Sequence, residues 1–385
     1  GNYDEYPPEL FIDQITNGVV AEYVLPKRAW IMAYQARSIQ ITGPGTIDGN
    51  ADAFIENRGE IIHSMRAPIG GRSQYLERPF TIFLIDCPSV ELRDFTIANP
   101  AFWALRLSGC DNANIYGIKI MTDMKVPNAD GIDIDRCENV VISNCHFETA
   151  DDCISVKSCS GTTVYGLTRN IIIEKCFFRT ASGAITLGTE SAGDIENVFL
   201  SDCQVVDSHR GFAVRAREGG AIKNVVFKDS TLETHAYGPD WWGHVEALHV
   251  TAASWDHPDG TTDGNPERLL EGTVENITFE NLKVKTEGSL LVWAQRLGLI
   301  KQIAFKNIDL TMASAEQWPP RTDLRPNGYQ DFIKEPHHSI ALVNCEDISI
   351  TDSKIHFASE NPRFFNKSKL IENVKNFEEH NLTIQ

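Results

Sequence analysis

Apolar and polar residues alternate in short runs along most of the chain, and each run bends at an Asn or Asp before the alternation resumes. Such runs lie at residues 89–97, 113–120, 140–147 and 171–178, and the same pattern returns at 197–203, 224–230, 276–282, 302–308 and 347–353. Alternation with a period of two is typical of β-strands with one buried face. Each run therefore predicts two short strands joined by a bend.

The runs recur about every 22 to 31 residues, which is the repeat length of a solenoid whose units are single coils. Stacked coils place their strands side by side and parallel. A β-propeller needs roughly 40 or more residues per blade, and no sustained helical periodicity competes with the strands. The pattern predicts an all-β fold, a single-stranded parallel β-helix.

We expect residues 1–385 to form one domain, because 42% apolar and 23% charged residues suffice for a continuous core and no segment is polar enough for a linker. Two stretches break the rhythm, around residues 234–268 and 313–338, both rich in Trp and Pro. Insertions in a solenoid project as loops, often on the binding face. These stretches are predicted loop insertions, with packing against the side of the helix as the alternative.

The formal net charge of −18 would repel nucleic acid and anionic membrane surfaces, so neither is an expected partner. A carbohydrate partner remains open, while nothing in the sequence indicates an oligomeric state. No run of 18 or more apolar residues predicts a membrane span. The chain begins at Gly1 with neither an initiator Met nor a signal peptide, which suggests a trimmed or mature form.

Nine cysteines recur partly at the interval of the repeat. Cys110 and Cys137, then Cys145, Cys176 and Cys203, are expected to stack in one column inside the solenoid. A CxxC metal spacing is absent. We interpret the cysteines as buried, unpaired thiols that pack as small hydrophobic side chains.

Three aspartates form the most specific motif of the sequence. Asp130 is followed one coil later by Asp151 and Asp152, and stacking would bring the three carboxylates to one sheet edge. Glycoside hydrolysis needs one carboxylic acid to protonate the leaving oxygen and one carboxylate to activate water or attack. Asp130, Asp151 and Asp152 are therefore the candidate catalytic residues. An Asn/Asp turn ladder or a calcium site is the alternative.

Later coils supply candidate residues for substrate binding. Arg215 and Arg217 alternate with Ala216, so both guanidinium groups point to one face, where they can bind a carboxylate or a sugar hydroxyl or form a solvated ion pair. Tryptophans in an insertion are as often packing anchors as platforms for a sugar ring. The other candidates are Asn128, Glu190, Trp241, Trp242, His244 and Glu246.

These motifs resemble glycoside hydrolase family 28, the polygalacturonase family. The similarity begins at residues 41–49, passes 78–79 and 99–103, is strongest over 128–158 and extends more weakly to about residue 228. The resemblance implies a right-handed parallel β-helix and hydrolysis with inversion, without metal or cofactor. It further implies Asp151 as the general acid, with Asp130 and Asp152 positioning and deprotonating the attacking water.

Three positions depart from the family pattern. Ala129 stands where the family has Thr, Gly183 stands at the histidine of a Gly-His-Gly motif, and Arg217 replaces a lysine. We therefore expect a divergent member whose substrate is another pectic or a non-pectic glycan. His209, His244 and Glu246 are the candidates to replace the histidine.

The leading hypothesis is a secreted or periplasmic glycosidase that acts on a uronic-acid-containing plant polysaccharide or its fragments. A non-catalytic carbohydrate-binding β-helix is the first alternative, and it predicts sugar binding without product. A calcium-dependent polysaccharide lyase is the second, with Asp130, Asp151 and Asp152 as calcium ligands and an arginine as base. A calcium requirement would separate the lyase from the hydrolase.

Overall fold

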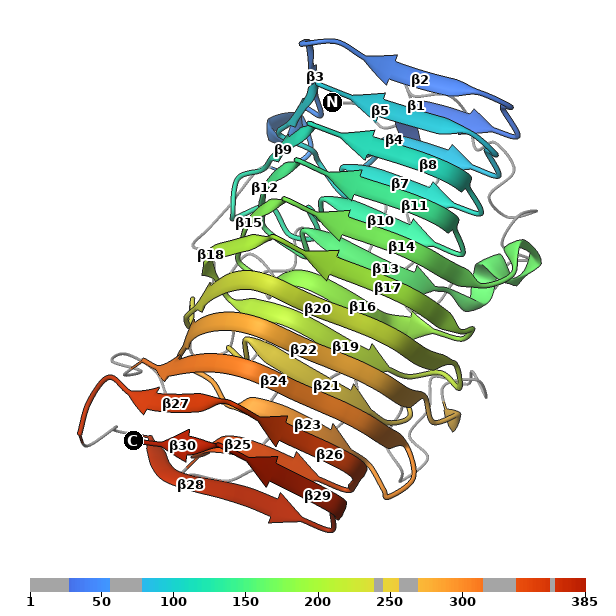
Figure 1. Ribbon diagram of the computed structural model, residues 1–385. Helices are drawn as coiled ribbons and strands as arrows, with labels where there is room; N and C mark the ends of the chain where they lie inside the picture. The colour runs from blue at the N-terminus through green and yellow to red at the C-terminus, as the bar shows by residue number, and fades with distance from the viewer. Residues whose placement is uncertain (1–27, 56–77, 239–244, 256–268, 314–336, 361–363) are drawn as a thin grey trace.

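Parallel strands stacked in chain order make up the protein, which Figure 1 shows as a column of coils running from the N-terminal to the C-terminal end. The computed structural model describes residues 28–55, 78–238, 245–255, 269–313, 337–360 and 364–385. Its stacked parallel sheets form the expected right-handed β-helix. No helix within these segments is long and apolar enough to cross a membrane.

One sheet of 11 strands forms a single face of the column in the described segments. All its pairings are parallel, and each strand pairs with its counterparts in the preceding and following coils. In order the strands are β1 (Ala29–Tyr34), β4 (Phe80–Ile85), β7 (Leu105–Ser108), β10 (Ile132–Asp135), β13 (Ile154–Ser158), β16 (Gly183–Ser191), β19 (Arg210–Ala216), β21 (Leu248–Ala252), β23 (Leu290–Ala294), β25 (His337–Val343) and β28 (Phe365–Glu372).

The rest of each coil belongs to a second sheet, of 19 strands in the same segments. Its strands are β2 (Ile39–Thr42), β3 (Thr46–Asp48), β5 (Val90–Arg93), β6 (Thr96–Ala98), β8 (Asp111–Tyr116), β9 (Lys119–Met121), β11 (Glu138–Ser143), β12 (His146–Thr149), β14 (Thr168–Glu174), β15 (Phe177–Thr180), β17 (Ile195–Ser201), β18 (Gln204–Ser208), β20 (Ala221–Thr234), β22 (Thr273–Thr286), β24 (Ile300–Met312), β26 (Cys345–Thr351), β27 (Lys354–Phe357), β29 (Lys375–His380) and β30 (Thr383–Ile384). Two short 3₁₀ helices, η2 (Ala51–Ala53) and η3 (Ser160–Tyr165), lie between strands.

Asparagines in the left-handed conformation mark the same corner of successive coils. Asn139, Asn170, Asn197, Asn224 and Asn276 all have φ between 55° and 59°. Each later side chain donates from Nδ2 to the Oδ1 of the one before, at 3.0, 3.1, 3.2 and 2.8 Å. Asn tolerates positive φ better than most residues, so this ladder fixes the corner and links neighbouring coils.

The interior of the column is one continuous apolar core. Aromatic rings stack from coil to coil, with Phe227, Phe279 and Phe305 separated by 5.2 and 5.0 Å between ring centroids. This follows from the alternation in the sequence, since every second residue of a strand points inward.

All nine cysteines are free and buried, as expected. The cysteines predicted to share one column lie in two rows: Cys110 and Cys137 follow strands of the 11-stranded sheet, while Cys145, Cys176 and Cys203 follow β11, β14 and β17 of the other sheet. The interval of the repeat is the same in both rows, so spacing alone did not separate them.

Strand β21 lies inside the stretch 234–268 that was predicted as a loop insertion, and its register with β19 and β23 makes it part of the sheet. Residues 239–244, 256–268 and 314–336 lie outside the described residues. The remainder of the two predicted insertions therefore stays a prediction.

Candidate active site

Three aspartates from two successive coils meet at one edge of the 11-stranded sheet. Ile132 of β10 pairs with Ile154 of β13. Asp130 and Asp152 each lie two residues before these partners, so they are level with one another. One carboxylate oxygen from each of Asp130, Asp151 and Asp152 lies within 4.8 Å of the other two. The carboxylates therefore converge as the coil spacing suggested.

Gly131 allows the two coils to come this close. Its backbone N–H donates to the carbonyl oxygen of Asp152 at 2.9 Å. A Cβ at this position would lie 2.3 Å from the carbonyl oxygen of Cys153. Any side chain here would force the coils apart and separate Asp130 from Asp152.

Burial raises the pKa of two of the three carboxyl groups. It raises the pKa of Asp130 well above its ordinary value, and the charges of Asp151 and Asp133 add to the effect. Burial, followed by the charge of Asp152, raises the pKa of Asp151 to about 7. A carboxyl group that is still protonated near neutrality can act as a general acid.

Asp152 differs because hydrogen-bond donors surround it. Its Oδ1 accepts from the Ser182 hydroxyl at 2.9 Å and from the Gly183 N–H at 2.8 Å. The Arg210 guanidinium lies 3.9 Å from the same oxygen. These contacts hold the Asp152 carboxylate in one orientation, so Asp152 is the member of the cluster best placed to accept a proton from a bound water.

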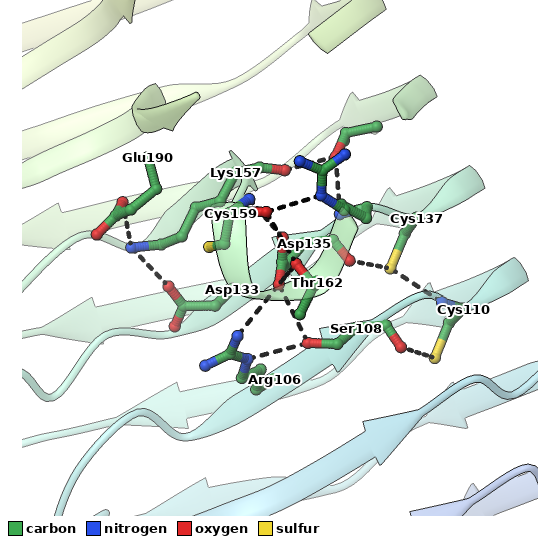
Figure 2. A network of polar contacts seen from close by, with 12 residues as sticks. Arg106, Ser108, Cys110, Asp133, Asp135, Cys137, Lys157, Cys159, Thr162 and Glu190 are labelled. Atoms are coloured by element: carbon green, nitrogen blue, oxygen red, sulfur yellow. Dashed lines mark hydrogen bonds and ion pairs between the residues drawn. The ribbon is translucent and has the colours of Figure 1, made fainter. Parts of the chain in front are cut away.

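A buried lysine lies along the same face of the sheet (Figure 2). Lys157 of β13 donates to Oε2 of Glu190 at 3.1 Å and lies 3.4 Å from Oδ1 of Asp133. Its ammonium also lies 4.5 Å from the ring centroid of Trp103. Burial alone would lower the pKa of Lys157, but the charges of Glu190, Asp133 and Asp130 act in the opposite direction and the net effect is a raised pKa. Lys157 is therefore a fixed positive charge beside the aspartates.

A second buried ion pair supports this face from below in the same view. Arg106 donates to Oδ2 of Asp135 at 3.1 Å and to the Ser108 hydroxyl at 3.0 Å. Asp135 also accepts from the Cys159 N–H at 2.9 Å and from the Thr162 hydroxyl at 2.8 Å. With all these donors Asp135 is satisfied, and its role is to anchor η3 against the sheet.

The predicted substrate-binding residues that the structure describes differ in their burial and in their contacts. Glu190 is paired with Lys157. Asn128 is half-buried, and its Oδ1 accepts from Arg78 at 3.4 Å. Arg215 is level with Gly188 of β16, while Arg217, just beyond β19, is buried and donates to the Thr251 hydroxyl at 3.2 Å.

The candidates to replace the family histidine are also placed. His209 immediately precedes β19 and is buried. Its backbone N–H donates to the carbonyl oxygen of Thr180 at 2.9 Å. Glu246 is buried and lies 3.6 Å from Nδ1 of His249. Trp241, Trp242 and His244 lie outside the described residues, so their predicted roles stay predictions.

Sequence reasoning did not select Ser182, Arg210 or Lys157 as site residues. A signal for Lys157 exists, because residues 132–135 and 154–157 alternate apolar and polar, so Asp133 and Lys157 must point out of the core. Arg210 offers no such signal, since its closeness to Asp152 depends on the register of three successive strands.

Within the described segments, the same three aspartates could also hold a metal ion. Calcium and magnesium take carboxylate oxygens, and three oxygens within 4.8 Å suit such an ion. One of the three carboxylates, however, is already bound by a serine and a backbone N–H. The expectation of metal-independent chemistry therefore stays a prediction.

Comparison with known proteins gives two kinds of match. Among curated proteins, a probable polygalacturonase of Vitis vinifera is 30% identical over 254 residues, 63% of this chain and 47% of that protein. Polygalacturonase QRT2 of Arabidopsis thaliana is 24% identical over 268 residues, 67% of this chain and 53% of that protein. The chain thus spans about half the length of these relatives.

Among solved structures, a family 28 exopolygalacturonase of Yersinia enterocolitica superposes with a TM-score of 0.64 and 17% identity, over 98% of this chain and 66% of that one. A polygalacturonase of Erwinia carotovora gives a TM-score of 0.53 and 18% identity, over 85% of this chain and 79% of that one. These matches establish the β-helix fold.

The family profile of glycosyl hydrolases family 28 matches residues 13–239, more than half of the chain and the whole segment that carries the aspartates. The chain therefore belongs to glycosyl hydrolase family 28.

Proposed function

We propose that this protein is a glycosidase that hydrolyses glycosidic bonds in a uronic-acid-containing, pectic polysaccharide or its oligosaccharides. The observation that carries the proposal is a carboxyl group of raised pKa next to a carboxylate that is held in place by hydrogen-bond donors. Asp151 is buried with its pKa raised to about 7, while Asp152 accepts two hydrogen bonds and faces a guanidinium. An acid beside a base is what glycoside hydrolysis requires.

In this mechanism Asp151 protonates the leaving glycosidic oxygen. Asp152 takes the proton of the attacking water, and Asp130, whose own pKa is raised, helps to orient that water by a hydrogen bond. Because Asp151 must be protonated, we expect activity to fall as the pH rises above about 7.

A uronic-acid substrate fits the local charge. The net charge of −18 repels a polyanion at long range, so attraction must come from cationic groups near the site. Arg215 lies on β19, the strand that follows β16 in the sheet, and Arg217 lies just beyond the end of that strand. The names of the relatives, polygalacturonases, agree with this substrate class. Such a polysaccharide lies outside the cell, so we propose a secreted or periplasmic location.

The stereochemical outcome is a separate part of the proposal. Inverting enzymes usually separate their carboxyl groups by about 6.5–9.5 Å and retaining enzymes by about 5–5.5 Å. The oxygen spacing of at most 4.8 Å is nearer the second value. We nevertheless propose inversion, because Oδ1 of Asp152 is committed to Ser182 and Gly183 and the third carboxylate gives the water a second acceptor. Proton NMR of the first anomer released decides the outcome, and retention would make Asp152 or Asp130 a nucleophile.

The test of hydrolysis is reducing-sugar release from pectic and neutral polysaccharides and oligosaccharides, with a chelator present. We expect release by the wild type and its loss, by at least about 100-fold, in Asp151→Asn. Asp94→Asn is the matched control, because Asp94 is exposed and its φ of 62° suits Asn equally well. Binding without release would favour the non-catalytic alternative. An unsaturated product that appears only with calcium would favour the lyase.

A further inference from the structure

Three groups converge on one oxygen of Asp152, and two come from the following coil. The Ser182 hydroxyl and the Gly183 N–H donate to Oδ1 at 2.9 and 2.8 Å. Arg210, one strand further on, lies 3.9 Å away. Within the described part of the chain no hydrogen bond to Oδ2 of Asp152 occurs. One oxygen is therefore anchored, and the other is left for the cluster of aspartates.

Arg210 and Ser182 act as a connected pair. Gly183 of β16 is level with Arg210 of β19, and the guanidinium donates to the Ser182 hydroxyl oxygen at 3.1 Å. Because that oxygen accepts from Arg210, its own proton is directed at Asp152. Ser182 is fully buried and Arg210 is 3% exposed. Hydrogen bonds that involve a charged group are stronger away from water, so the contacts from Arg210 through Ser182 to Asp152 are strong ones.

A side chain at Gly183 would require the side chains of Thr186 and Asp152 to move from their present places. A Cβ there would lie 2.7 Å from Oδ1 of Asp152 and 2.6 Å from Oγ1 of Thr186. A histidine at this position would displace the carboxylate from its present place. Support for Asp152 must therefore come from neighbouring positions.

We propose that Ser182 and Arg210 are positioning residues that hold the Asp152 carboxylate in the orientation needed to activate water, in place of a side chain at residue 183. The inference rests on the proposed function, since it assigns the support of that reaction's base. Ser182 and Arg210 contact the Asp152 carboxylate directly, and neither was among the candidates considered from the sequence.

The same pair acts on the neighbouring acid. Burial and the charge of Asp152 raise the pKa of Asp151, while Ser182 and Arg210 lower it. In the described segments, the charges of Asp133 in the preceding coil and of Lys157 in β13 also act on Asp130, the third member of the cluster. Removing Ser182 or Arg210 should therefore let Asp151 keep its proton to a higher pH.

The kinetic test compares Ser182→Ala, Arg210→Gln and Arg210→Lys with the wild type across pH. We expect kcat to fall about 10- to 100-fold in the first two, with KM changed less than about threefold, and Arg210→Lys to lie between them and the wild type. The alkaline limb of the rate profile should move to higher pH in Ser182→Ala and Arg210→Gln.

Matched controls separate positioning from a general effect on folding. Ser230→Ala removes a buried hydroxyl that bonds the Cys203 N–H and the Lys228 carbonyl in the other sheet. Arg136→Gln removes a buried guanidinium that bonds the Cys159 carbonyl. Both should keep the wild-type pH profile. The inference is wrong if Ser182→Ala and Arg210→Gln lose no more activity than these controls and if the alkaline limb of their pH–rate profiles stays at the wild-type pH.

A second measurement needs no substrate. In protein labelled with ¹³C at the aspartate carboxyl carbons, the Asp151 signal is assigned by its absence from Asp151→Asn and titrated in each variant. We expect its midpoint to rise in Ser182→Ala and Arg210→Gln and to stay in the controls. Lack of sugar release by the wild type would contradict the proposed function. An unmoved Asp151 midpoint in an active protein would contradict only the role of Ser182 and Arg210.

Discussion

Lys157 donates to Glu190 at 3.1 Å where both side chains are buried, and the same ammonium lies 3.4 Å from Asp133. Two carboxylates thus depend on one cation. Burial raises the pKa of Asp133 to about 7, even though Lys157 and Arg106 oppose this rise. Lys157 therefore offsets the negative charge of Asp133 and Glu190 next to the aspartate cluster.

Removing this cation should be strongly destabilising near neutral pH. We expect Lys157→Met to lower the free energy of unfolding by about 3–5 kcal/mol, because it leaves buried carboxylates without a partner. Urea denaturation at pH 7.5 measures the loss. Adding Glu190→Gln to Lys157→Met should recover part of it, and a double variant no more stable than the single one would contradict the ion pair as its cause.

The stability of the wild type should decline with rising pH in a window set by Asp151. The pKa of this group is raised from 3.8 to about 7 in the folded protein, so the folded state binds the proton more tightly than the unfolded state. Its contribution to stability is fully present below about pH 4 and is lost as the pH rises through about 7.

The part of this change that comes from Asp151 should be no more than about 4 kcal/mol, the equivalent of about three pKa units, and the raised pKa values of Asp130 and Asp133 add to it in the same direction. Asp151→Asn cannot titrate, so its unfolding free energy should change less between pH 4 and 8 than that of the wild type. At pH 8 the variant should be the more stable protein. Parallel curves for the two proteins in urea denaturation would contradict the raised pKa.

The asparagine ladder should contribute to stability without affecting catalysis. Asn197 has a φ of 57°, donates to Asn170 at 3.1 Å and accepts from Asn224 at 3.2 Å. Asn197→Ala loses the hydrogen bonds and places Cβ in a strained conformation, for an expected loss of about 1–2 kcal/mol. Asn197→Gly loses only the hydrogen bonds and should lose less. Equal losses in thermal unfolding would show that the left-handed backbone contributes nothing.

The repeat fold could be predicted from the sequence because each coil carries its own signal. The alternation in residues 276–282 and the Asn at its start reappear in β22 as buried Ile277 and Phe279 beside a left-handed Asn276. The three aspartates were placed for the same reason, since one coil separates Asp130 from Asp152.

The support of Asp152 could not be predicted in this way. Ser182 and Arg210 come from two further coils whose lengths differ, since Ile154 pairs with Ile185, 31 residues later, and Gly183 pairs with Arg210, 27 residues later. A one-residue change in such a register moves a side chain to the other face. Pattern alone therefore could not place Arg210 beside Ser182.

Gly183 offers the sharpest test of the geometry around Asp152. In Gly183→Ala the added Cβ would lie 2.7 Å from Oδ1 of Asp152, so the carboxylate must move. Because a small misplacement of a catalytic group is costly, we expect kcat to fall about 100-fold. Gly183→His should be no more active, even though the family carries a histidine there.

The control for Gly183→Ala is Gly220→Ala, whose Cβ would lie 2.2 Å from the carbonyl oxygen of Ser191, away from the aspartates. Gly220→Ala meets backbone atoms and Gly183→Ala meets side-chain oxygens, so the control should lose at least as much stability, about 1–3 kcal/mol or more, from overpacking. Only Gly183→Ala should lose activity per folded molecule, measured as kcat at a temperature well below unfolding. If Gly183→His matched the wild type, Asp152 would tolerate a side chain at residue 183 and would not depend on its present contacts with Ser182 and Gly183.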